Sequence, residues 1–173
     1  MKSRRIGLVA AAAAVLGGAA PAAAVQVGEI AALVPATPPT DPDRAAALRR
    51  EAQELFSQPK QWKKAVRLLE QSASLRAAND AAAYDCLMYA GRIRAALGDM
   101  RNARVDFEKA AAHALARGAV VDAANAYIDA AHTAVALKDG AGARELVDSA
   151  SLLAASPLLT EMDRNRLRAR LDA

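Results

Sequence analysis

Hydrophobic and polar positions follow the helical period from residue 43 almost to the C-terminus, and the pattern is interrupted only at short, regular breaks. Each break contains residues that stop or start helices: Ser57-Gln58-Pro59-Lys60, Asn79-Asp80, Gly98-Asp99, Gly118, Asp139-Gly140 and Ser156-Pro157. They predict seven helices, over residues 43–56, 60–77, 80–97, 100–117, 119–137, 140–154 and 157–171. Because the connections are short, we expect neighbouring helices to run antiparallel.

Three of these helices share one register of small and large side chains. In the stretch LGDMRNARVDFEKAAAHA (97–114), a turn precedes a small residue, a large apolar residue and another small residue on one helical face. The three copies are Ala65, Leu69 and Ser72; Ala103, Phe107 and Ala110; and Ala143, Val147 and Ala150. The small residues let a neighbouring helix approach closely, and the large residue fills the remaining space. We therefore expect Leu69 and Phe107 to be buried between helical hairpins.

This register resembles the second helix of the tetratricopeptide repeat, over roughly residues 44–155. The middle unit also has Gly91 two turns before Gly98, where the family has a glycine in its first helix, and Gln53 and Ala131 take that place in the outer units. The units are longer than the family's 34 residues, at about 38 and 40, so neighbouring right-handed α-solenoid families are the alternative. The resemblance implies an all-α fold: a right-handed α-solenoid of about three antiparallel hairpins with a C-terminal capping helix.

The resemblance also implies a concave binding surface formed by the first helix of each hairpin. The matching positions are Arg50, Glu54, Asp85, Met88, Arg92, Asn125, Ile128 and His132. They combine both charge signs with two apolar anchors, Met88 and Ile128, which suits a protein or peptide partner. The surface lacks the dense basic cluster with which family members bind an acidic carboxyl terminus.

The N-terminus has the three parts of a secretory signal peptide. Basic Lys2, Arg4 and Arg5 precede an apolar run, which ends in the small residues before a predicted cleavage after Ala24. A retained membrane anchor is the alternative, but the run is shorter than the roughly 20 residues of a spanning helix. We therefore predict a signal peptide (1–24), a proline-rich linker (25–42) and a helical repeat domain (43–173), exported to the periplasm or, as second choice, secreted.

Charge and cysteine content narrow the classes of partner. Removing residues 1–24 takes away three of the 23 basic residues and none of the 19 acidic ones, so the net charge falls from +4 to near +1. The remaining chain lacks the basic surface expected of a nucleic-acid-binding protein. Cys86 is the single cysteine, so an intramolecular disulfide is impossible, and its apolar context predicts a buried thiol, with intermolecular pairing as the alternative.

The last predicted helix is strongly basic. Thr160 and Asp163 form a capping-box pattern, and four arginines follow at alternate positions: Arg164, Arg166, Arg168 and Arg170. Alternate positions spread over two sides of a helix, so we interpret this segment as a solvated cap of the repeat array. Contact with an acidic partner or a membrane surface is the alternative.

Residues that carry catalysis or bind metals are sparse. His113 and His132 are the two histidines, on different predicted helices, and no metal-ligand pair, phosphate loop or nucleophile elbow occurs in the sequence. The chain is therefore predicted to be non-catalytic, without cofactor or metal. The first hypothesis is an exported scaffold for protein–protein contacts in a cell-envelope assembly, including a membrane-associated one. The second is a carrier or sensor of a peptide or small apolar ligand, and the third is an enzyme with an unrecognised site.

Overall fold

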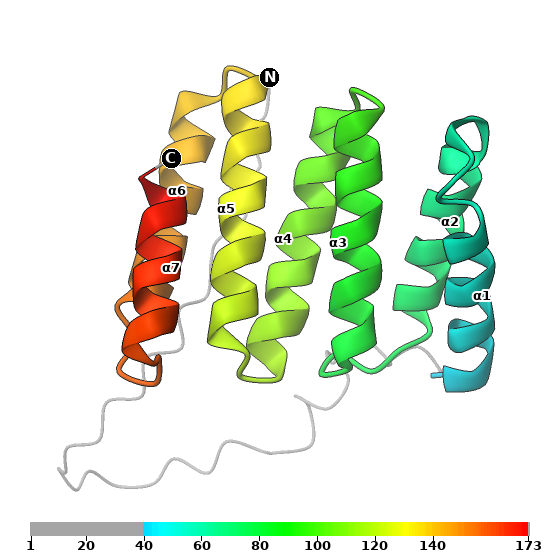
Figure 1. Ribbon diagram of the computed structural model, residues 1–173, viewed down its shortest axis with the longest axis horizontal. Helices are drawn as coiled ribbons and strands as arrows, with labels where there is room; N and C mark the ends of the chain where they lie inside the picture. The colour runs from blue at the N-terminus through cyan, green and yellow to red at the C-terminus, as the bar shows by residue number, and fades with distance from the viewer. Residues whose placement is uncertain (1–39, 173) are drawn as a thin grey trace, which may run out of the picture. The chain divides into compact units, whose positions relative to one another are not determined.

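The computed structural model describes residues 40–172, which form an all-α unit (Figure 1). Its helices are α1 (Pro42–Glu54), α2 (Trp62–Ser74), α3 (Ala81–Ala96), α4 (Met100–Ala116), α5 (Val120–Ala136), α6 (Gly140–Ala154) and α7 (Glu161–Leu171), with a short 3-10 turn, η2 (Pro59–Gln61), before α2. The predicted signal peptide and all but the end of the predicted linker lie outside the described residues. None of the helices in residues 40–172 has the length and apolar character needed to cross a membrane.

Five of the seven α-helices in residues 40–172 begin with a side-chain cap. The side chains of Asp41, Asp80, Asp99, Asp139 and Thr160 each accept a hydrogen bond from a backbone N–H in the first turn of the helix that follows. The prediction for the last helix was wrong at its start, 157. That helix begins at Glu161, because Thr160 supplies the cap and Ser156-Pro157 forms a preceding turn.

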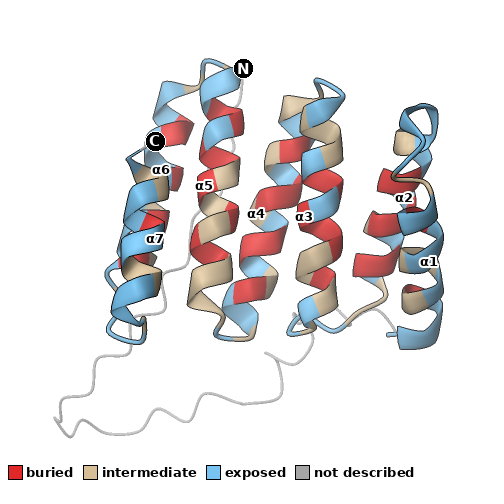
Figure 2. Cartoon of the chain, in the orientation of Figure 1, coloured by how far each residue is buried: buried red, intermediate tan, exposed pale blue. Residues whose placement is uncertain are grey.

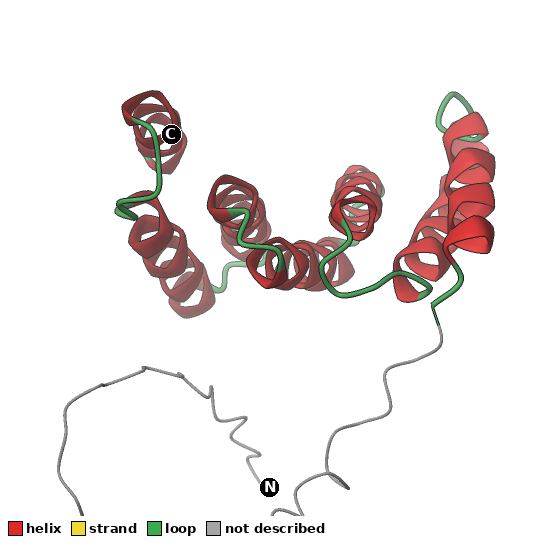
Figure 3. Ribbon diagram, turned by 90° about the horizontal axis from the view of Figure 1, so that it is seen from below, coloured by secondary structure: helices red, strands yellow, loops and turns green. Residues whose placement is uncertain are grey.

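Consecutive helices run antiparallel and pack against one another in chain order (Figure 1). Seen along the helix axes, α1, α3 and α5 form one layer and α2, α4 and α6 the other (Figure 3). The C-terminal α7 packs against both α5 and α6. At the two ends of the row, α1 and α7 project beyond α3 and α5 on the same side, so the row of helices is curved and α3 and α5 lie on its concave side (Figure 3).

The buried positions lie along the sides of the helices that face their neighbours (Figure 2), and most of them are alanine. Leu69 and Phe107 are buried, as predicted from the register, and so are their small neighbours in α2 and α4. In α6 the large residue of the register, Val147, is 37% exposed, and the adjacent Leu146 is buried. Within the described chain only the short α7 follows α6, so the side of α6 that carries Val147 is left partly uncovered.

The place that holds Gly91 in α3 is taken by other residues in α1 and α5. Gly91 is buried against the ring of Phe107, and Ala131 is buried at the matching place in α5. Gln53, at the matching place in α1, is exposed, and the neighbouring Ala52 is buried.

A buried ion cluster joins α2, α3 and α4. The guanidinium of Arg94 lies 2.6 Å from Asp106 Oδ2 and 2.9 Å from Glu70 Oε1. Asp106 is fully buried, and its Oδ1 has no hydrogen-bond partner within residues 40–172. Burial raises the pKa of Asp106 to about 6, although the nearby Arg94 acts in the opposite direction. The pattern of small and apolar residues in α4 gave no indication of this buried carboxylate.

Candidate binding groove

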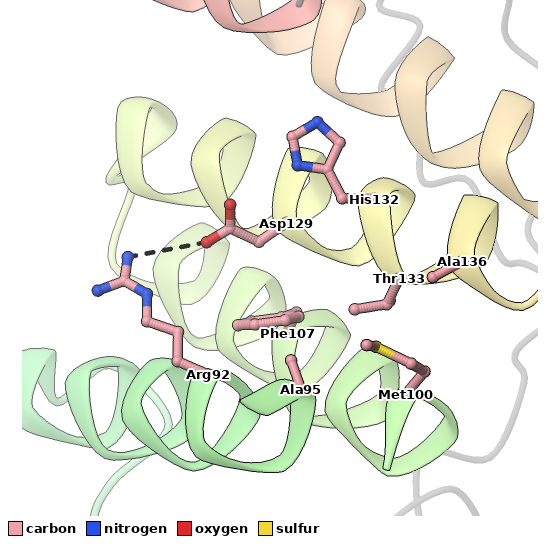
Figure 4. A pocket seen from close by; sticks show the side chains of 8 residues that line it. All are labelled: Arg92, Ala95, Met100, Phe107, Asp129, His132, Thr133 and Ala136. Carbon is pink, nitrogen blue, oxygen red and sulfur yellow. Dashed lines mark ion pairs between the residues drawn. The ribbon is translucent and has the colours of Figure 1, made fainter. Parts of the chain in front are cut away.

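A groove of about 400 Å³ lies between α3 and α5, on the concave side of the unit (Figure 4). Its floor is apolar and comes from α4, with the ring of Phe107 and the thioether of Met100. One wall is formed by Ala95 of α3, and the other by Thr133 of α5. Phe107 and Thr133 are themselves buried, so the surface that the groove offers comes mainly from Ala95, Met100 and Ala136.

One end of the groove is polar. Arg92 of α3 reaches across to Asp129 of α5, at 3.7 Å between Nη2 and Oδ2 (Figure 4). Asp129 is held more closely by Arg170 of α7, at 2.5 Å from Oδ1, and Arg170 also donates a hydrogen bond to Asn125 Oδ1. The side chain of Arg92 is 61% exposed, whereas that of Asp129 is 15% exposed. The closer partner of Asp129 is therefore the arginine of α7, and Arg92 faces solvent.

A second hollow of about 430 Å³ lies on the other side of α5, where α5, α6 and α7 meet. Its lining includes Val135, which is 64% exposed, together with Val147 and Leu171. His132 of α5 lines both hollows and is exposed. The C-terminal half of α5 is therefore a ridge between two apolar hollows, which we call the α5 ridge and define by Asp129, His132 and Val135.

The structure brings together only part of the predicted site. Of the predicted positions, Arg92 and His132 line the groove between α3 and α5. Met88 and Ile128 were predicted as apolar anchors, but both are buried; Met88 belongs to the main core and Ile128 packs against α7. Met88 lines neither hollow, whereas Ile128 lies in the lining of the second hollow with little of its side chain exposed.

The remaining predicted positions lie apart from the groove. Arg50 and Glu54 are exposed on α1 and line neither hollow. Asp85 forms an ion pair with Arg49 of α1, at 3.0 Å, and Asn125 accepts the hydrogen bond from Arg170. Asp85 and Asn125 therefore act mainly as links between helices.

Sequence reasoning missed several groove residues. Asp129 occupies the position one turn before His132 on α5, and the helical period could have indicated it. Phe107 was assigned to the core and Met100 to the start of a predicted helix, yet both also form the groove floor. Arg170 could not be found from spacing, because its place depends on how α7 docks on α5.

The described chain carries little reactive chemistry. Cys86 is buried beside Ser72, with 3.5 Å between its Sγ and the serine Oγ, and burial raises the pKa of its thiol. Within residues 40–172 no three side chains of histidine, cysteine, aspartate or glutamate gather where they could hold a metal ion. The groove's own chemistry is apolar contact combined with exposed cationic hydrogen-bond donors.

Comparison with protein-family models, with curated proteins and with solved structures gives no match to this chain. The class is therefore defined by the structure itself: the described chain is an all-α protein whose consecutive helices pack in a row with a concave side (Figure 3).

Proposed function

We propose that this chain is an exported, non-catalytic scaffold or adaptor, built as a tetratricopeptide-like α-solenoid, which binds a segment of a protein partner in a cell-envelope assembly. The observation that carries the proposal is the groove between α3 and α5. It joins an apolar floor to exposed polar groups on Arg92 and His132, the combination with which helical scaffolds recognise peptides and helices.

The repeat interpretation is supported by packing within the hairpins. Gly91 of α3 contacts Phe107 of α4, and small residues flank the large buried residue on both α2 and α4. Contacts between neighbouring helices dominate, which is typical of arrays in which each unit packs on the next. About three hairpins followed by α7 fit this organisation.

A carrier or sensor of a peptide or small apolar ligand is the second candidate function. The groove volume of about 400 Å³ favours it, because small-molecule sites commonly have volumes of roughly 300 to 1,000 Å³. The two functions differ in the size of the bound molecule, and in both cases that molecule would lie over the apolar floor near Phe107.

A site-specific photo-crosslinker distinguishes these functions. We would place benzoylphenylalanine at His132 in the groove and, as the matched control, at exposed Arg101 on α4, in the organism that produces the chain. A scaffold predicts discrete protein adducts at position 132 that are absent at position 101. Adducts of the same kind at both positions, or small-molecule adducts alone at position 132, would contradict the scaffold.

Export is tested separately by the mass of the purified chain. Cleavage after Ala24 predicts an N-terminus at Val25 in material from the cell envelope. An intact Met1 in a membrane fraction would instead support a retained anchor.

A further inference from the structure

We infer that the groove and the second hollow form one site, which takes a partner segment with a carboxylate flanked by two apolar side chains and laid across the α5 ridge. This inference rests on the proposed function, because it names the chemistry of the partner that the scaffold would bind. It also assigns α7 a place in the binding surface, in addition to covering the end of the array.

The charges of the ridge define the polar part of the partner. Asp129 is shared by Arg92 and Arg170, so the three groups together carry one excess positive charge. Arg170 is the closer partner and donates the hydrogen bond to Asp129, whereas Arg92 makes only a 3.7 Å ion pair. Arg92 therefore keeps guanidinium N–H groups directed to solvent beside an apolar floor. A single carboxylate complements this arrangement, because it can accept those hydrogen bonds and balance the excess charge.

The two hollows define the apolar parts. The first is floored by Phe107 and Met100, and the second is bordered by Val135 and Val147. They lie on opposite sides of His132, so one segment crossing the ridge can place an apolar side chain in each. Covering Val135, which is 64% exposed, and the partly exposed Met100 supplies the hydrophobic gain that one ion pair near solvent does not.

A polyanion fits this surface less well. A polyanion that binds a surface with one excess positive charge releases few counterions, so its binding gains little free energy from that release. Most of the exposed lining of both hollows is also apolar. A basic partner would meet Arg92 and Arg170 directly. Of the charged partners, the mixed apolar and acidic segment is the one that both the charges and the hollows favour.

The test uses a phage-displayed library of random 12-residue peptides, selected on the chain purified as the cell processes it. The variants are Arg92→Glu and Val135→Asp, with Arg101→Glu as the control for a charge reversal at an exposed site outside both hollows. Thermal unfolding of each variant shows that it remains folded. Representative selected peptides are then synthesised, each with a partner in which the carboxylate is replaced by the amide, and their Kd values are measured.

We expect enrichment of peptides with an acidic residue between two apolar ones. The Arg92→Glu and Val135→Asp changes should each weaken binding about tenfold or more, and Arg101→Glu should have little effect. The amide peptide should bind the native chain about tenfold more weakly than the acid. If the selected peptides lack an acidic residue but their binding is still weakened by Val135→Asp, this inference is overturned and the proposed function stands. If no peptide is enriched, or binding is insensitive to Arg92 and Val135, the inference and the groove-based function both fail.

Discussion

Gly91 and Phe107 are fitted to each other so closely that no side chain can be added at position 91. A Cβ built on Gly91 would lie 2.7 Å from Cε1 of Phe107 and 2.9 Å from its Cδ1. The same ring forms the floor of the groove between α3 and α5. The packing of one hairpin and the shape of the binding surface therefore depend on the same pair of residues.

Replacing Gly91 with alanine should destabilise the protein. Alanine favours a helix by up to about 1 kcal/mol over glycine, but the clash must displace a buried ring, which costs about 1–3 kcal/mol. We expect a net loss of about 1–2 kcal/mol in the free energy of unfolding, measured by urea denaturation. Gly140→Ala is the matched control, because its Cβ would meet no atom within 4 Å, and it should be neutral or slightly stabilising. Equal effects of the two changes would contradict the tight contact.

Lys138 occupies a backbone conformation that normally favours glycine. Its φ is 60°, in the turn between α5 and α6, whereas the corresponding turns before α4 and α5 use Gly98 and Gly118 with φ of 81° and 71°. Lys138→Gly should relieve this strain and raise the free energy of unfolding by up to about 1 kcal/mol. Gly98→Ala should lower it by a similar amount. Thermal unfolding of both variants checks the opposite signs, and a loss of stability in Lys138→Gly would show that the turn is not strained.

The buried carboxylate of Asp106 should make stability depend on pH. Its pKa is about 6 in the folded chain and near the ordinary 3.8 when unfolded, so between these values the folded state binds more protons. The contribution of Asp106 to stability is therefore fully present below about pH 4 and is lost as the pH rises through about 6. Arg94, Glu70 and Lys109 are the charged groups that act on Asp106.

Asp106→Asn isolates this effect, since the amide does not titrate. We subtract the unfolding free energy of the variant from that of the native chain. As the pH rises from about 4 to 6, this difference should fall, because the native chain loses stability and the variant does not. Above about pH 7 it should be constant. Denaturation series at several pH values measure it. A difference that stays constant across this range would mean that the carboxylate is ionised in the folded chain throughout.

Cys86 should be unreactive while the chain is folded. Its side chain is fully buried and its thiol pKa is raised, so both access and thiolate formation are suppressed. A thiol reagent such as dithionitrobenzoate should label it slowly in buffer and within seconds in strong denaturant. Rapid labelling in buffer, or a disulfide-linked dimer on a non-reducing gel, would instead support the intermolecular pairing that the sequence left open.

The sequence by itself determined the helices and much of their packing. Aspartate caps, glycine at the turns and the period of the apolar residues indicated most of the helix boundaries, because these are local properties of the chain. The burial of Leu69 and Phe107 followed from the same periodicity. The alanine content also predicted close helix packing, since small side chains allow neighbouring helices to approach.

Only the tertiary structure decided which residues line the groove. Periodicity assigns a residue to one face of its helix but cannot say how deeply neighbouring helices cover that face, so Met88 and Ile128 were predicted exposed and are buried. The same limit applies to Val147, which remains partly exposed because little chain packs beyond α6. The contact of Arg170 with Asp129 joins residues 41 positions apart, and it exists only because α7 docks against α5. Long-range contacts of this kind set the charge and the depth of the site, and local sequence patterns do not encode them.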